Sequence, residues 1–384
     1  MRPSFHPLRI SAVTPETADS ASFTFEMPAE SGRTASARSG QYLTFRIPWK
    51  GLELTRCYSL SSCPELNEPW RVCVKRVPGG RVSNGMLDQL RVGDSVLVSE
   101  PQGRFVLEPQ ERSPLVFFAG GSGITPILSL VKAALATTER PVTLVYANRD
   151  RASIIYEHEL EALAAAYPPR FQLHHHLDSD AGFLTEAAVS RFLPRHGEAR
   201  YYLCGPSAFR ALVEQTLLSA GVSPAHILEE RFVSPTDPDR QTGEAEEAEG
   251  GTFPDRFSLW IEGRSRTVPY ISGKTLLESA FTAGLQPPHS CQSGYCGSCM
   301  VRVKAGTVRM RCHDALTEVE VEQGLALLCQ SVPKSQEPLE LDCDAASFRM
   351  AGRGGSVERR AHPWGVWVTF VLMAVGTVLL RTFP

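Results

Sequence analysis

The sequence predicts a multidomain chain with four parts: an antiparallel β-barrel, an α/β domain with a parallel sheet, a third domain around a cysteine cluster, and a C-terminal transmembrane helix. Three observations lead to this prediction. Short alternating strands give way to alternating strands and helices near residue 110. An acidic stretch rich in Pro and Gly, 234–255, has the composition of a linker, and an apolar run occupies 363–381.

The composition narrows the possible functions. The chain has 384 residues, 42% of them hydrophobic, and a formal net charge of -3, so it can bury several cores and is poorly suited to bind nucleic acid. The first residues lack the apolar run of a secretory signal, which predicts a cytoplasmic location for the folded domains. In that reducing compartment, clustered cysteines bind metal or carry out redox chemistry more often than they form disulfides.

Residues 1–109 are predicted to form the barrel, because runs such as QYLTFRI and WRVCVKRV alternate between apolar and polar residues. In the segment RCYSL, Arg56 and Tyr58 share one face of a strand, and Ser59 follows. An arginine pairs with phosphate and a tyrosine ring covers a flavin, so this strand is a flavin candidate. Gly80 and Ser83 add donors for a second phosphate contact. Taken alone, the same strand pattern is more often ordinary packing.

Residues 110–233 are predicted to form the α/β domain. PLVFFAG and PVTLVYAN have the composition of buried strands, and PILSLVKAALA has the pattern of a helix. Between the first strand and this helix lies AGGSGITP, where glycines allow a diphosphate to approach the backbone. Thr125 is expected to cap the helix and Pro126 to open it. The alternative is an ordinary tight turn between strand and helix.

Residues 1–233 resemble the ferredoxin-NADP reductase family in four motifs that occur in the family's order: RCYSL, GDSVLVSEPQGRFVL, GGSGITP and CGP. The resemblance implies a flavin and a pyridine nucleotide. It assigns flavin contacts to Arg56, Tyr58, Ser59, Gly80, Val82 and Ser83. It assigns nucleotide contacts to Gly121, Gly123, Thr125 and Pro126. Ser59 and Cys204 would line the contact between flavin and nicotinamide, unless Cys204 is only a buried residue at a strand end.

The cysteine cluster has the spacing Cys-x4-Cys-x2-Cys followed by a distant fourth cysteine, as in plant-type [2Fe-2S] proteins. The predicted ligands are Cys291, Cys296, Cys299 and Cys329. Zinc fits less well, because structural zinc ligands usually come in two short pairs. The segment 256–344 resembles a plant-type ferredoxin, which implies the β-grasp fold.

The three units predict one electron path. A nicotinamide gives up two electrons as hydride and a [2Fe-2S] cluster accepts one, so a flavin is expected between them. The order of domains resembles reductases similar to the phenylacetyl-CoA oxygenase reductase component and to phthalate dioxygenase reductase. The segments GGRVSN and ERF are closer to the former, which favours FAD over FMN.

The choice between NADPH and NADH rests on the segment ANRDRAS. Arg149 and Arg151 are suited to a 2′-phosphate, which favours NADPH, whereas Asp150 is suited to a free ribose hydroxyl. A second short segment, the histidines 174–176 in FQLHHHL, is not expected to bind metal. Neighbouring side chains on a strand point to opposite faces, so the three rings cannot converge on one ion.

The C-terminal run predicts a membrane anchor. The uncharged helix would reach roughly 27 Å, close to the hydrocarbon thickness, and arginines precede it in the linker 345–362. The expected partner is therefore an electron acceptor in the membrane, such as a di-iron desaturase or hydroxylase. Two alternatives are a reductase for a soluble oxygenase, with the tail as a docking helix, and a membrane-tethered redox sensor.

Overall fold

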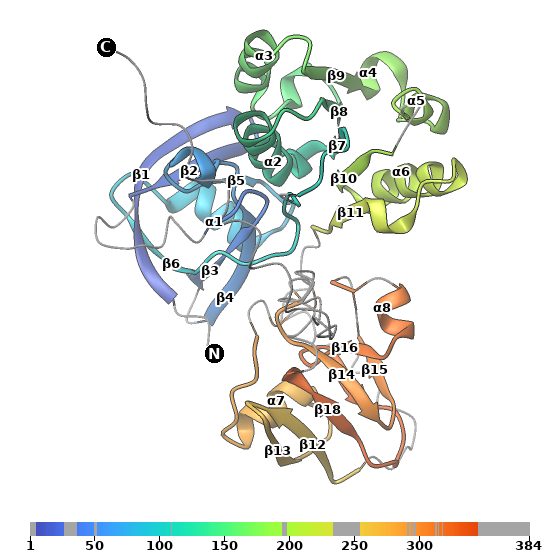
Figure 1. The fold of residues 1–384 in the computed structure, drawn as a ribbon. Helices are drawn as coiled ribbons and strands as arrows, with labels where there is room; N and C mark the ends of the chain where they lie inside the picture. Colours follow the sequence, from blue (N-terminus) through green and yellow to red (C-terminus); the bar gives the residue numbers. More distant parts are fainter. Residues whose placement is uncertain are drawn as a thin grey trace, which may run out of the picture.

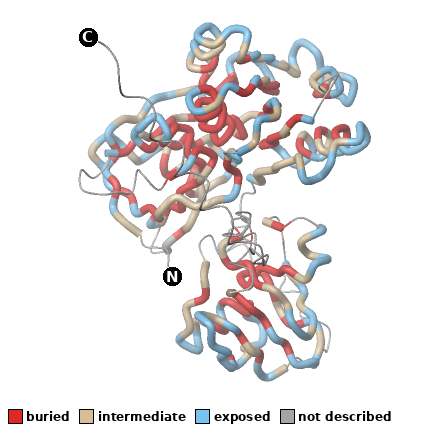
Figure 2. The backbone as a smooth tube through the Cα atoms, in the orientation of Figure 1, coloured by how far each residue is buried: buried red, intermediate tan, exposed pale blue. Residues whose placement is uncertain are grey.

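The computed structural model describes residues 5–26, 37–49, 52–108, 110–193, 198–232, 254–289, 292, 294, 297–311, 313, 315–316 and 318–344. Figure 1 shows three domains in chain order: a barrel in blue, an α/β domain in green to yellow, and a third domain in orange. Each domain has a buried core. In Figure 2 the buried backbone of the third domain lies apart from that of the other two domains.

The first domain is a six-stranded antiparallel sheet with the strand order β4-β3-β6-β1-β2-β5. An isolated bridge between Leu60 and Val72 joins the strands at its two edges, which closes the sheet into a barrel. One helix, α1, follows β5 along the chain. The elements are β1 (Phe5–Thr17), β2 (Ser20–Phe25), β3 (Tyr42–Trp49), β4 (Leu52–Ser59), η2 (Pro64–Leu66), β5 (Arg71–Lys75), α1 (Arg81–Gln89) and β6 (Ser95–Ser99).

The second domain is a five-stranded parallel sheet with the order β11-β10-β7-β8-β9. All six residues of β7 are buried, as expected of a central strand covered on both faces. The strands are β7 (Leu115–Gly120), β8 (Val142–Asn148), β9 (Phe171–Leu177), β10 (Arg200–Cys204) and β11 (Ile227–Glu230). The helices are η3 (Gly121–Gly123), α2 (Ile124–Thr137), η4 (Arg151–Ser153), α3 (Glu157–Ala166), α4 (Asp178–Ala181), α5 (Glu186–Ser190), α6 (Ser207–Ser219) and η5 (Pro224–His226).

The third domain is a mixed sheet with the order β13-β12-β18-β14-β16, in which β12 and β18 run parallel. The helix α7 begins at a capping box of Thr275 and Glu278 and buries Leu276 and Leu277 in the domain core. A mixed sheet with one buried helix is the arrangement expected of a β-grasp fold. The elements are β12 (Arg256–Ile261), β13 (Arg264–Pro269), α7 (Leu276–Thr282), β14 (Met300–Ala305), β15 (Val308–Met310), α8 (Glu318–Glu322), β16 (Leu325–Leu327), β17 (Ser331–Pro333) and β18 (Glu340–Asp342).

The predicted transmembrane helix has to be corrected. Within the described residues, no helix is long and apolar enough to cross a bilayer. The longest described helix, α2, has 14 residues, and at 1.5 Å per residue it reaches only about 21 Å of the ~30 Å required. The transmembrane helix in the predicted fold class, and the membrane localisation inferred from it, were therefore wrong. The run 363–381, on which both depended, lies outside the described residues.

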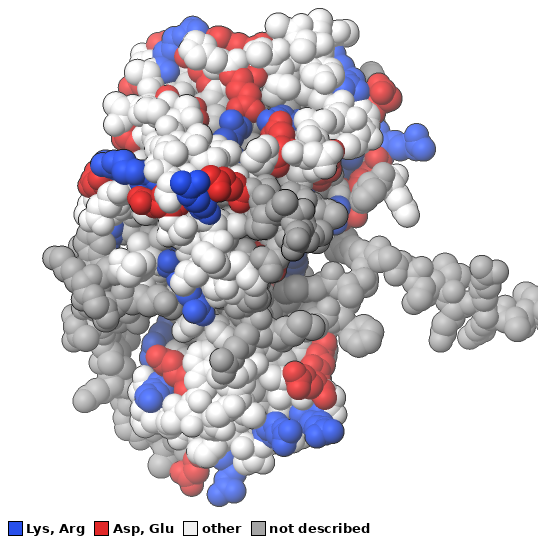
Figure 3. All heavy atoms as spheres, turned by 90° about the vertical axis from the view of Figure 1, so that its left-hand side faces the viewer, with Lys and Arg blue, Asp and Glu red and all other residues white. Residues whose placement is uncertain are grey.

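Charged side chains do not form a single-sign patch on the face shown in Figure 3, where described acidic and basic residues are interspersed. This agrees with the small net charge of -3.

Candidate functional site

The flavin candidate strand, β4, pairs with β3 along its whole length. Tyr42 lies opposite Ser59, and Phe45 lies opposite Arg56. The ring of Tyr58 meets Phe45 edge to face, with the ring centroids 5.4 Å apart, so packing fixes its orientation. Burial raises the pKa of the Tyr58 phenol above its ordinary value, and the phenol therefore stays protonated. Arg56 and Tyr58 both lie on this strand and share one of its faces, and their contact with a flavin stays a prediction.

The start of α1 provides backbone donors for an anion. Gly80 caps the helix, and glycine has no side chain that could accept from the first-turn N–H groups. A Cβ on Gly80 would lie 2.7 Å from the hydroxyl of Ser83, and that hydroxyl accepts from the Val77 N–H at 3.2 Å. Only glycine fits this tight approach. Val82 and Ser83 are buried in the first turn, and the cradle suits a phosphate of FAD.

The glycine loop lies between β7 and α2 at the carboxyl end of the parallel sheet. Gly121 has a φ of +53°, and nothing lies within 4 Å of the Cβ it lacks. Its carbonyl accepts from the Tyr146 hydroxyl at 3.1 Å. The helix begins at Ile124 with Gly123 as the N-cap, while the Thr125 hydroxyl donates to the Ser122 carbonyl. Thr125 is therefore not the cap that the sequence led us to expect, and Pro126 lies in the first turn. An open backbone at a helix start suits a dinucleotide diphosphate.

The CGP turn packs directly against this loop. Ala119 and Cys204 are register partners in neighbouring parallel strands. Arg210, itself buried, donates to the Gly205 carbonyl at 3.0 Å and pairs with Glu229, which holds the turn in place. Cys204 is fully buried, and this burial raises the pKa of its thiol well above the ordinary value. The thiol therefore stays protonated at neutral pH, and its predicted place beside the nicotinamide remains a prediction.

The segment after β8 carries Arg149, Asp150 and Arg151, the residues that bear on the choice between NADPH and NADH. Asp150 accepts from the Ser153 N–H at 2.9 Å and forms a capping box with that serine. Arg151 contacts Glu157 at 2.8 Å and Glu161 at 3.1 Å, so two carboxylates compensate its charge. The nearest acidic contact of Arg149 is Asp19, at 4.0 Å. Of the two arginines, Arg149 is the less compensated and the better candidate for a phosphate.

The two described cluster cysteines lie side by side at one end of the third domain. Cys299 and Cys329 are both buried, and the Leu328 N–H donates to the Cys299 carbonyl at 3.0 Å. The Gln330 amide donates to the Cys329 sulfur at 3.6 Å, and such contacts tune a metal-bound thiolate. Gly294 and Gly297 have φ values of +86° and +69°, which curl the loop. Cys291 and Cys296 lie outside the described residues.

These positions fit an iron–sulfur cluster on the chemistry of the donors. Two cysteine sulfurs buried side by side are the soft ligands that iron–sulfur clusters take in proteins. In the part of the chain that the structure describes, no three metal-ligating side chains gather elsewhere. The three histidines of β9 do not converge: His174 packs on Phe192 and His175 on Tyr146, at ring distances of 4.8 and 5.9 Å.

Sequence reasoning missed a polar network between the barrel and the α/β domain. Lys132 is buried on α2, with its Nζ 2.6 Å from the carboxylate of Glu68 and 2.8 Å from that of Glu159. Arg71 of the barrel contacts the same Glu159 at 2.7 Å. The Tyr156 hydroxyl lies 2.8 Å from that of Ser61. The one signal in the sequence was a lysine within an otherwise uncharged helix, PILSLVKAALA.

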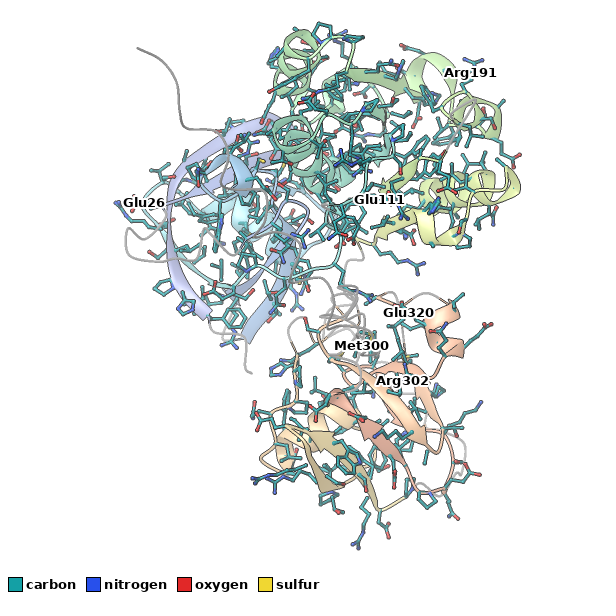
Figure 4. All side chains as sticks on the ribbon, in the orientation of Figure 1. Glu26, Glu111, Arg191, Met300, Arg302 and Glu320 are labelled. Carbon is teal, nitrogen blue, oxygen red and sulfur yellow. The ribbon has the colours of Figure 1, made fainter. Side chains whose placement is uncertain are left out.

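A second missed contact joins the cluster loop to the barrel. The hydroxyl of Ser298, the residue before Cys299, donates to the Gln102 side-chain oxygen at 3.2 Å. The backbone of Gln102 exchanges two hydrogen bonds with Tyr42 at 2.8 and 2.9 Å, and Tyr42 is the register partner of Ser59. Figure 4 shows Met300 at the end of the third domain that faces the other two domains, nearer to them than Arg302. Ser298 therefore contacts the barrel at Gln102, which is linked to the flavin candidate strand by way of Tyr42.

Three protein families match the chain, one for each domain. Residues 7–107 match the oxidoreductase FAD-binding domain. Residues 117–215 match the oxidoreductase NAD-binding domain. Residues 260–334 match the 2Fe-2S iron-sulfur cluster binding domain. The predicted cofactors, FAD, NAD(P)H and a [2Fe-2S] cluster, are confirmed by these matches.

Similar proteins cover nearly the whole chain. The ferredoxin reductase component of 3-ketosteroid-9-alpha-monooxygenase from Mycobacterium tuberculosis is 34% identical over 335 residues, 85% of this chain and 93% of that protein. One component of 1,2-phenylacetyl-CoA epoxidase from Escherichia coli is 30% identical over 358 residues, 89% of this chain and 98% of that component. The structure of phthalate dioxygenase reductase is 26% identical, with a TM-score of 0.58, and covers 88% and 98% of the two chains.

Proposed function

We propose a specific electron path for this chain, which belongs to the family of NAD(P)H-dependent FAD/2Fe-2S reductases that serve oxygenase systems. Hydride passes from NADPH at the glycine loop of the second domain to FAD at the barrel. Single electrons then pass from FAD to the cluster of the third domain, and from the cluster to an oxygenase component. Flavins link two-electron donors to one-electron acceptors, which is the chemistry that FAD supplies when bound.

The contact of Ser298 with Gln102 is the observation that carries this proposal. Ser298 precedes the cluster ligand Cys299, and Gln102 is hydrogen-bonded to Tyr42, the register partner of Ser59, so this contact supports a short path from flavin to cluster. The barrel also contacts the α/β domain, because Arg71 pairs with Glu159 and Glu68 pairs with Lys132. The barrel is thus in contact with both of its neighbours, as a carrier between a hydride donor and a one-electron acceptor has to be.

We assign the flavin contacts to the barrel residues already named. The Arg56 guanidinium and the start of α1 at Gly80, Val82 and Ser83 would hold the phosphates. Tyr58 would cover the ring system, and the hydroxyl of Ser59 would face its reactive edge. Gly121, Gly123, Thr125 and Pro126 would hold the nucleotide diphosphate, with Cys204 buried beneath them. The four cysteines 291, 296, 299 and 329 would be the cluster ligands.

For the nucleotide we propose NADPH, bound through Arg149. That side chain is 71% exposed and lies 4.0 Å from Asp19, so it can turn toward a 2′-phosphate at small cost. The Asp150 carboxylate, which would favour NADH, is engaged in the capping box with Ser153.

For the acceptor we propose an oxygenase component. The relatives support this, because the proteins from Mycobacterium tuberculosis and Escherichia coli are named as parts of a monooxygenase and an epoxidase. The finer expectation of a membrane di-iron desaturase or hydroxylase depended on the C-terminal run, and no described residue supports it.

Anaerobic titration of the purified protein tests the path. We expect one FAD, two irons and two acid-labile sulfides per chain, and NADPH should bleach both the flavin and the cluster absorbance. Addition of an oxygenase component should reoxidise the cluster and restore repeated turnover. A protein that is reduced once and then stalls with every oxygenase component tried would be a redox sensor, and zinc in place of iron would remove the path altogether.

A further inference from the structure

Besides the contact of Ser298, a second polar contact joins the barrel to the third domain, and it involves an arginine with no role so far. Arg104 follows β6 in the segment PQGRF, two residues after Gln102. Its Nη1 lies 3.1 Å from Oε1 of Glu320 on α8, and its Nη2 donates to the carbonyl of Ala315 at 3.5 Å. One guanidinium of the barrel thus contacts two points of the third domain.

The segment that Arg104 contacts packs on the cluster loop. The Ala315 N–H donates to the Gly294 carbonyl at 3.0 Å. The Cβ of Ala315 lies 3.7 Å from where a Cβ on Gly297 would be. Leu316, the next residue, is buried in the core of the domain. Gly294 and Gly297 belong to the loop of the cluster ligands. A displacement of Ala315 would therefore also displace that loop.

Gln102 and Arg104 form one docking edge of the barrel. Gly103 between them has a φ of +123°, and a Cβ there would come within 3.2 Å of the Tyr42 ring. The backbone at Gly103 therefore packs on Tyr42, while Gln102 reaches Ser298 and Arg104 reaches Ala315 and Glu320. Figure 4 shows Glu320 on the side of the third domain that faces the barrel and the α/β domain.

We propose that Arg104 is a positioning residue for electron transfer from FAD to the cluster, acting through a charge contact that salt weakens. The proposal rests on the proposed function and deepens it. The step is the transfer of one electron: the reduced flavin is oxidised by one electron, the cluster is reduced by one, and no covalent bond changes. Electron transfer depends on the separation of the two groups, so a loosened third domain slows this step and leaves hydride transfer unchanged.

The exposure of the two partners makes the contact sensitive to salt. The Arg104 side chain is 48% exposed and that of Glu320 is 22% exposed. Ion pairs at such positions are weak and are screened by salt.

The experiment uses the full-length holoenzyme in anaerobic stopped flow with NADPH. Arg104→Ala should leave the rate of flavin bleaching unchanged and slow cluster bleaching about 3- to 5-fold, as expected for one partly exposed ion pair. Arg104→Lys keeps the charge and should recover part of the rate. In the wild type, cluster bleaching should slow toward the Arg104→Ala rate near 1 M salt, where the Debye length is only about 3 Å. Arg104→Ala itself should show little salt dependence.

Two further variants make the result specific. Arg104→Glu places a like charge opposite Glu320 and should slow cluster bleaching. The double variant Arg104→Glu with Glu320→Arg reverses the ion pair and should restore the rate of cluster bleaching. The radius of gyration from small-angle X-ray scattering should rise in the single variant and return in the double variant. Arg9→Ala is the matched control, because Arg9 pairs at 2.7 Å with Glu26 of the same barrel, which Figure 4 shows away from the third domain.

Two outcomes would overturn the proposal. One is a wild-type rate of cluster bleaching in both Arg104→Ala and Arg104→Glu. The other is a salt dependence of Arg104→Ala equal to that of the wild type. A protein that shows no bleaching with NADPH would refute the proposed function instead, and the scattering experiment would still decide whether Arg104 docks the third domain.

Discussion

Gly123 and Cys204 approach so closely that a Cβ on Gly123 would lie 2.2 Å from the Cys204 carbonyl oxygen. The glycine loop and the CGP turn, which are about 80 residues apart in the sequence, are thus pressed together at the carboxyl ends of β7 and β10. This edge of a parallel sheet is where nucleotides bind in open α/β folds. The glycine is required here by contact with the neighbouring strand, since its own φ of -61° is ordinary.

Gly123→Ala should therefore separate the loop from β10 and impair nucleotide binding. We expect a loss of about 1–3 kcal/mol in unfolding free energy, as for other overpacked sites. The KM for NADPH should also rise, because the displaced loop no longer holds its backbone N–H groups in place for the diphosphate. Thermal unfolding and steady-state reduction of a dye measure the two effects. Gly221→Ala is the comparison, because its φ is +83° but nothing lies within 4 Å of the added Cβ. A wild-type KM in Gly123→Ala would contradict the close packing.

Cys329→Ser should remove the cluster and spare the flavin. We expect loss of the cluster absorbance and of electron delivery to the oxygenase, while reduction of the flavin by NADPH continues. Visible spectroscopy and iron analysis check this result. Cys343→Ala is the control, because Cys343 is equally buried in the third domain but lies outside the ligand spacing. Retention of iron in Cys329→Ser at the wild-type level would rule out Cys329 as a ligand.

Lys132→Met should weaken the contact between the barrel and the α/β domain, because Glu68 and Glu159 would lose the cation between them. The carboxylates are partly exposed, so we expect roughly 2 kcal/mol of destabilisation, less than the 3–5 kcal/mol of a fully buried broken pair. Denaturant unfolding and the rate of flavin bleaching by NADPH should both change. Lys75→Met, at a looser pair with Asp19 of 3.9 Å, should change neither by a comparable amount.

The stability of this contact should also depend on pH. Burial tends to raise the pKa of Glu159, but Arg71 and Lys132 outweigh it and hold the pKa below the ordinary value of 4.5. A carboxylate with a lowered pKa stabilises the fold above its unfolded pKa, and this stabilisation is lost as pH falls through the folded pKa. Below about pH 4.5 the wild type should lose melting temperature more steeply than Glu159→Gln. Parallel curves for the two proteins would contradict the assignment.

Arg149→Ala should affect NADPH and not NADH. We expect the KM for NADPH to rise about 10-fold or more and that for NADH to stay constant, since only NADPH carries the 2′-phosphate. Steady-state kinetics with both nucleotides measure the ratio. Arg151→Ala should have a smaller effect, because Glu157 and Glu161 already compensate that charge. Equal changes in KM for NADPH and NADH would show that Arg149 does not bind the 2′-phosphate.

The sequence by itself determined the chemistry of the chain and the class of each folded domain. The spacing of the four cysteines, the glycine loop between strand and helix, and the alternating strands depend on short-range geometry, which a local pattern records. The separation of His174 and His175 onto opposite faces of β9 followed from the same geometry. The local pattern failed at Thr125, because the 3-10 turn of Gly121–Gly123 leads directly into α2 and leaves Gly123 as the cap.

Only the tertiary structure decided how the domains meet. Lys132 contacts Glu68, which is 64 residues away in the sequence. Ser298 contacts Gln102 across 196 residues, and Arg104 contacts Glu320 across 216 residues. No periodicity or motif encodes such partners, because each pair forms only after separately folded surfaces dock. Hydropathy alone predicted a membrane helix, and among the described residues no helix is long and apolar enough to cross a bilayer. A short pattern specifies what a segment is able to form, whereas the folded chain decides which distant groups lie within contact distance.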